Sequence, residues 1–239
     1  MREASPQVAA VVQAIGEACG ADLASVVQFS QPFYWTGEGI VADAERLLAV
    51  VSERADNFVE VVTTAYAAHR PPLPTWWFQR GQWYQFTTTT AAFYAKHHSR
   101  VLYGQDLRSD WPLPADWRRA VRATLRWLLF NVRGRLLPQA LLAADSHRWG
   151  RELWRATLYV LSEALFLLNE PSLTADTVLI DFAAEFYGHP IATLVQELDL
   201  LRQELEEEEA PPEAWGDFVG QAHWAFEQAA RWLWQEVRP

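Results

Sequence analysis

Short apolar runs separated by loop-forming residues make up the first 110 residues. Continuous apolar or β-branched runs predict strands, at 23–29, 44–51, 57–64 and 82–90. Apolar residues at helical spacing predict helices, at 6–20 and 91–103. Between the first two strands, residues 30–41 contain Pro32, Gly37 and Gly39, so we expect a loop there. The pattern predicts a mixed β-sheet with accompanying helices.

After Asp110 the pattern changes to helical periodicity, and Pro112 and Pro114 mark the change. Helices are predicted near 115–132, 136–144, 147–168, 174–187, 190–208 and 212–236. Strands followed by helices predict the α+β class: a mixed sheet at 1–110 and an all-α helical bundle at 111–239.

Composition narrows the classes of protein that fit. Of 239 residues half are hydrophobic, and the net charge of −10 argues against general binding to nucleic acid. The single cysteine, Cys19, excludes an internal disulfide and a cysteine-rich metal site. No apolar run approaches 18 residues and no signal peptide is evident, so we expect a cytoplasmic protein without a membrane partner.

Two carboxylates stand at the entrance of the second predicted strand. Asp43 and Glu45 are two positions apart, and side chains of an extended strand alternate between its faces. We therefore expect both on the same face. Paired carboxylates of this kind bind Mg²⁺ in sites for phosphoryl or nucleotidyl transfer.

The order of these features resembles a known family. A strand at Val26–Phe29, glycines at 37 and 39, an Asp-x-Glu pair at 43 and 45, and a later Leu-Tyr-Gly at 102–104 are similar to motifs of small polymerase-beta-type nucleotidyltransferases. Aminoglycoside nucleotidyltransferases belong to that group. The segment at 158–186 is similar to the helical half of the family, so the resemblance covers nearly the whole chain.

The resemblance implies a catalytic centre that uses Mg²⁺ and a nucleoside triphosphate. Asp43 and Glu45 stand at the metal and catalytic positions, and Glu60 is the candidate for the third carboxylate. Phosphate binding would fall to the residues of the first loop, namely Ser30, Gln31, Gly37 and Gly39.

The chain departs from the family at several of these positions. The family has Gly-Ser where this chain has Ser30-Gln31, and a Cβ at Ser30 crowds the place where the backbone approaches phosphate. Ala42 stands where the family has serine before the first carboxylate. Gln85 stands where a third acid is expected, and an amide cannot serve as a base.

A run of arginines follows the predicted boundary. Arg118, Arg122 and Arg126 are four residues apart, so they form one stripe on a helix. One interpretation is a solvated face that pairs with the acidic segment at 204–213. The other is a cationic wall that binds a triphosphate, with Arg118 and Arg122 as ligands. The thirteen tryptophans fit core packing, a ligand pocket or a homodimer face.

We predict a degenerate nucleotidyltransferase-fold protein that is noncatalytic and binds a nucleotide, a small molecule or a protein. The lost Gly-Ser and the missing third acid favour this hypothesis. The alternative is a divergent Mg²⁺-dependent nucleotidyltransferase, which moves a nucleoside monophosphate from a triphosphate to the hydroxyl of a small molecule or protein.

Overall fold

The chain divides into two compact units. The computed structural model describes residues 4–36, 39–53, 58–68, 73–82, 88–142, 145–168 and 171–238. The first unit, called here the sheet unit, consists of residues 1–31 and 44–115. The second, the helical unit, consists of residues 32–43 and 116–239. Residues 32–43 are called the hairpin tip. The chain thus passes from one unit to the other three times.

The described strands form one mixed sheet. They are β1 (Leu23–Trp35), β2 (Ile40–Val51), β3 (Thr75–Gln79) and β4 (Ser99–Gly104). Their order is β3-β2-β1-β4, with β3 parallel to β2 and β4 antiparallel to β1. β1 and β2 extend beyond the sheet unit and end in the hairpin tip. This sheet and the helices of the chain confirm the mixed α+β class.

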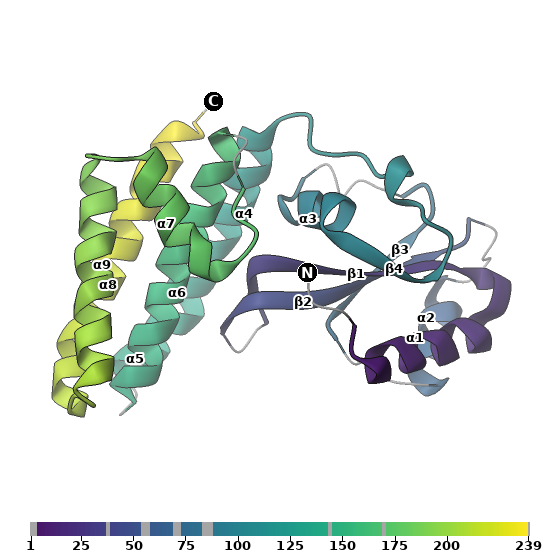
Figure 1. Ribbon diagram of the computed structural model, residues 1–239, viewed down its shortest axis with the longest axis horizontal. Helices are drawn as coiled ribbons and strands as arrows, with labels where there is room; N and C mark the ends of the chain where they lie inside the picture. The colour runs from purple at the N-terminus through teal and green to yellow at the C-terminus, as the bar shows by residue number, and fades with distance from the viewer. Residues whose placement is uncertain are drawn as a thin grey trace. The chain divides into compact units, whose positions relative to one another are not determined.

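Two helices cover one face of the sheet. They are α1 (Pro6–Cys19) and α2 (Phe58–Ala68), and Figure 1 shows both on the same side, with α3 (Ala91–His97) on the other. Ser5 caps α1 by accepting a hydrogen bond from the Val8 N–H, and Pro6 occupies the first helical position, where its missing N–H costs nothing. The buried core beneath these helices comes from α1, β1, β2 and α2: Val12, Ile15, Leu23, Val26, Leu47, Ala49 and Ala65.

Several predictions for this half were wrong. Residues 58–64, expected as a strand, begin helix α2, because Val61 and Ala65 bury one helical face despite the β-branched run. Residues 99–103, expected as helix, form β4, and the aromatic strand β3 was missed. The loop expected at 30–41 is largely strand. Of the strand expected at 82–90, residues 82 and 88–90 are not in a strand, and residues 83–87, which include Gln85, lie outside the described part.

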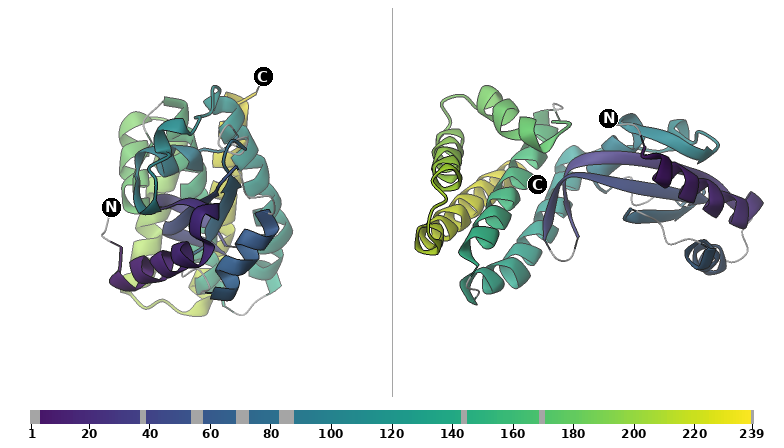
Figure 2. Two further views of the ribbon diagram at one scale, coloured as in Figure 1. Left: turned by 90° about the vertical axis from the view of Figure 1, so that its right-hand side faces the viewer. Right: turned by 60° about the horizontal axis from the view of Figure 1, so that its bottom comes forward.

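The helical unit follows the predicted pattern closely. Its helices are α4 (Trp117–Asn131), α5 (Leu137–Leu142), α6 (Ser146–Leu165), α7 (Ala175–Glu185), α8 (Pro190–Glu207) and α9 (Pro212–Glu236). Asp116 and Asp145 cap α4 and α6 through their carboxylates. α6 and α9 lie side by side (Figure 2). Their close approach at Gly150 brings the Phe218 ring against that backbone.

Among the residues that the structure describes, no helix combines the length and the apolar character that crossing a bilayer requires.

Candidate functional site

The segment expected to bind phosphate is part of a β-strand. Ser30 and Gln31 lie within β1, and Gln31 is buried. Gly39 closes the hairpin by accepting a hydrogen bond from the Thr36 N–H at 2.9 Å, and Gly37 lies outside the described residues. Successive N–H groups of an extended strand point in opposite directions, whereas a phosphate-binding loop directs them at one anion. Residues 30–35 therefore do not form such a loop.

Asp43 is used as a structural cap within the helical unit. Its Oδ1 accepts a hydrogen bond of 2.8 Å from the N–H of Ala175, the first residue of α7. That N–H has no partner within its own helix, so the carboxylate satisfies an otherwise free donor. Its negative charge also interacts favourably with the positive end of the helix dipole. The backbone of Asp43 is left-handed, with φ of 48°. This turn interrupts the strand alternation on which the expected common face of Asp43 and Glu45 depended.

Glu45 lies in the sheet unit and belongs to a different polar group. Its Oε2 accepts a hydrogen bond of 3.0 Å from the amide of Gln28, a buried residue of β1. The amide oxygen of Gln28 accepts in turn from Arg100 of β4 at 2.7 Å. Three strands thus contribute one carboxylate–amide–guanidinium chain. It links Glu45 to a cation through a neutral amide.

The remaining predicted site residues are not part of this hydrogen-bonded group. Glu60 is exposed in the first turn of α2. Arg118 donates to the carbonyl of Glu236 at 2.8 Å, and the partly buried Arg122 leaves its Nε without a hydrogen bond. Within the described ranges, no group of three or more His, Cys, Asp or Glu residues is placed to hold a metal ion.

The hairpin tip is held by the helices of its unit. Phe33 stacks on Tyr159 at a centroid distance of 6.0 Å, and Trp35 meets Trp127 edge-on at 6.1 Å. The N–H of Ile40 donates to Oε2 of Glu152 at 2.7 Å, and Glu152 is itself buried. Because a buried carboxylate needs partners, this hydrogen bond fixes the tip against α6.

A pocket of about 320 Å³ lies where the hairpin tip meets α6, α7 and α8. We call it the arginine pocket. Its lining is Phe33, Ala42, Arg151, Trp154, Arg155, Leu158, Ala175, Asp176, Leu179, Asp199 and Arg202. The four residues from α6 are spaced i, i+3, i+4 and i+7, so they form one helical face. All lining residues belong to the helical unit.

Carboxylates hold the three arginines of this pocket in place. Arg151 donates to Glu206 at 2.9 Å and Arg155 donates to Glu152 at 2.8 Å. Arg202 donates to Asp199 through Nε and Nη2 and to the second oxygen of Glu206 through Nη1 at 2.7 Å. Burial lowers the pKa of Arg202, but its hydrogen bonds to Asp199 and Glu206 and their charges raise it above its ordinary value. These hydrogen bonds therefore hold all three guanidinium groups in position.

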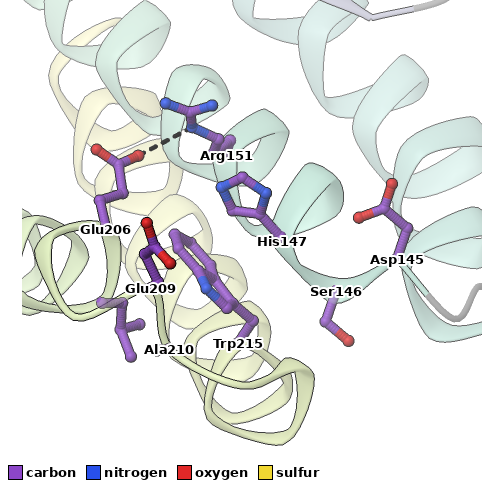
Figure 3. A pocket seen from close by; sticks show the side chains of 9 residues that line it. Asp145, Ser146, His147, Arg151, Glu206, Glu209, Ala210 and Trp215 are labelled. Atoms are coloured by element: carbon purple, nitrogen blue, oxygen red, sulfur yellow. Dashed lines mark hydrogen bonds and ion pairs between the residues drawn. The ribbon is translucent and has the colours of Figure 1, made fainter.

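A second pocket of about 470 Å³ lies between the start of α6 and the turn from α8 to α9. Figure 3 shows the His147 ring beside Trp215, and the two centroids are 4.4 Å apart. The acids around it have structural partners in two cases: Asp145 caps α6, and Glu206 pairs with Arg151, as the dashed line marks. Arg151 lines both pockets.

The sequence pointed to the cluster of arginines but not to the ones that line the pocket. It singled out the stripe on α4, whereas the acidic segment at 204–213 provides Glu206 to Arg151 and Arg202. The sequence signal that could have identified the pocket arginines was the i, i+4 spacing of Arg151 and Arg155, with Trp154 between them.

No family model matches the chain, and searches of the curated proteins and of the solved structures gave no match either.

Proposed function

We propose that this chain is a noncatalytic protein with a nucleotidyltransferase-like architecture, and that it binds a small molecule in its helical unit. The continuation of β1 as a strand through Ser30 and Gln31 carries the first half of this proposal. Transfer of a nucleotide needs a loop that holds the triphosphate while Mg²⁺ neutralises the leaving pyrophosphate. An extended strand at that position provides no such loop.

The engagement of the two carboxylates supports the same conclusion. Mg²⁺ requires oxygen ligands in near-ideal octahedral geometry. One oxygen of Asp43 is occupied by the Ala175 N–H, and one oxygen of Glu45 by the Gln28 amide. In this arrangement Asp43 stabilises α7 and Glu45 stabilises the polar chain across the sheet.

The arginine pocket supports the second half of the proposal. It combines fixed cations with the buried aromatic rings of Phe33 and Trp154. A concave site lined mainly by apolar groups with a few oriented polar ones is typical of small-molecule binding.

Calorimetric titration of ATP and GTP, with and without Mg²⁺, tests the noncatalytic function. The proteins are the wild type, Asp43→Ala and Asp43→Asn. We expect that ATP and GTP show no Mg²⁺-dependent binding to the wild type that is lost in Asp43→Ala. We expect Asp43→Ala instead to lower the free energy of unfolding by about 1 kcal/mol, because the Ala175 N–H loses its acceptor. Asp43→Asn, which keeps an acceptor oxygen, should lose less.

Magnesium-dependent binding or turnover that disappears in a folded Asp43→Ala variant would refute the proposal. Turnover that is lost in this way would establish the alternative, a divergent nucleotidyltransferase.

A further inference from the structure

We propose that the arginine pocket binds a small organic oxyanion, a carboxylate or phosphate monoester that carries an apolar or aromatic group. This inference rests on the proposed small-molecule function and names the class of ligand. It concerns only residues of the helical unit.

Two arginines on α6 retain donors for such a ligand. Among the hydrogen bonds of the described residues, Arg151 uses only its Nε, for Glu206, and Arg155 uses only its Nη1, for Glu152 and the carbonyl of Ile40. Both Nη groups of Arg151, and the Nε and Nη2 of Arg155, remain available. The side chains are 46% and 39% exposed, so a ligand can reach them. They lie one helical turn apart on the face that lines the pocket.

The surrounding acids orient these arginines and leave part of their hydrogen-bonding capacity unused. Arg202 has each of its nitrogens donating to Asp199 or Glu206, so its role is to hold Glu206 in place. Glu206 then fixes Arg151 from the other side. A guanidinium that is already oriented loses little conformational freedom on binding, and its planar fork matches the paired oxygens of a carboxylate or phosphate.

Apolar side chains also line the pocket. Phe33 and Trp154 are 2% and 5% exposed, and Leu158 and Leu179 add aliphatic surface. The volume of about 320 Å³ is at the small end of the range for ligand sites. An anion with one aromatic ring matches this size and the combination of guanidinium and apolar groups.

Isothermal titration of the full chain with four matched probes tests this inference. Phenyl phosphate and phenylacetate represent the phosphate and the carboxylate, 2-phenylethanol is the neutral probe and 2-phenylethylamine the cationic one. The proteins are the wild type, Arg151→Gln, Arg155→Gln and the control Arg148→Gln, which removes an exposed charge from α6 outside the pocket. Constant ionic strength keeps general screening equal.

We expect at least one of the two oxyanions to bind the wild type, and the alcohol and the amine not to bind. Affinity should fall tenfold or more in Arg151→Gln, because the guanidinium donors of Arg151 are lost. The fold should be retained, because Glu206 keeps Arg202 as a partner. Arg148→Gln should bind like the wild type. Arg155→Gln leaves Glu152 without its cation. The variant Arg155→Lys is therefore tested as well, because it keeps the positive charge but lacks the planar guanidinium. Both variants should bind the oxyanion more weakly than the wild type.

Failure of both oxyanions to bind at millimolar concentration would overturn the inference. So would equal weakening in Arg148→Gln and Arg151→Gln, or equal binding of 2-phenylethanol. A different result refutes the noncatalytic function, namely nucleotide binding that requires both Mg²⁺ and Asp43. The failures of the two proposals can therefore be distinguished.

Discussion

Single ion pairs connect distant segments of the helical unit, and the pair between Arg133 and Glu227 is bidentate. Nε and Nη2 of Arg133 donate to the two oxygens of Glu227 at 2.9 and 2.6 Å. The Arg133 hydrogen bonds outweigh burial, and with nearby positive charge they hold the pKa of Glu227 below its usual value of 4.5. A carboxyl whose folded-state pKa is lowered stabilises the fold above the unfolded pKa and loses that contribution as pH falls.

We expect Glu227→Gln to lower the free energy of unfolding at pH 7 by roughly 0.5–1 kcal/mol, the range for a partly exposed pair. The difference from the wild type should shrink as pH falls below 4.5 and Glu227 takes up a proton. Urea unfolding across this range measures it. The control Asp217→Asn removes an exposed acid from α9. A difference that is constant with pH, or equal in the control, would contradict the prediction.

The roles of individual residues were the least predictable level. Asp43 was predicted as a metal ligand, whereas its hydrogen-bond partner in the structure, the Ala175 N–H, is 132 positions away. Nothing in the local sequence around Asp43 indicates that partner. The left-handed backbone at Asp43 was equally hidden, because an aspartate adopts it only when surrounding contacts favour it.

At the scale of elements, the helices of the second half were predictable and the strands of the first half were less so. α6, α8 and α9 each extend over several turns, so their apolar periodicity repeats often enough to be recognised. β3 and β4 have five and six residues, too few to separate a strand from part of a helix. The end of β4 was visible, however, in the glycine at 104.

Gly104 allows β4 to turn closely past β1. Its φ is 71°, and a Cβ there would lie 2.2 Å from the carbonyl oxygen of Ala24, which accepts a hydrogen bond from the N–H of Gln105. Gly188 has a similar φ of 77° but open space around it. We expect Gly188→Ala to cost roughly 1–2 kcal/mol for backbone strain alone, and Gly104→Ala roughly 1–3 kcal/mol more for the clash. Equal losses in thermal unfolding would show that the contact with Ala24 relaxes freely.

At the scale of the molecule, the two units are interleaved along the chain. The helical unit takes its residues from 32–43 and from 116–239, so a single cut in the sequence does not separate it from the sheet unit. Sequence patterns could indicate that strands come first and helices afterwards. They could not show that the turn between two strands packs with helices that follow much later.

Replacing Phe33 tests how much the hairpin tip contributes to the stability of the helical unit. Phe33→Ala removes a ring that is 2% exposed and stacks on Tyr159. We expect a loss of roughly 3–5 kcal/mol, with faster amide hydrogen exchange in α6. The control Phe130→Ala removes a ring that is 69% exposed, and should cost less than about 0.5 kcal/mol. Unchanged exchange in α6 would contradict a structural role for the hairpin tip.

The interleaved chain order also has a consequence for biosynthesis. Ile40 leaves the ribosome 112 residues before Glu152, the side chain that accepts its N–H. At typical elongation rates this interval is about 6 to 22 seconds. Trp35 and Phe33 lack their native aromatic partners from α4 and α6 until Trp127 and Tyr159 have emerged. Nascent chains of this protein should therefore depend on ribosome-associated chaperones until α6 has emerged.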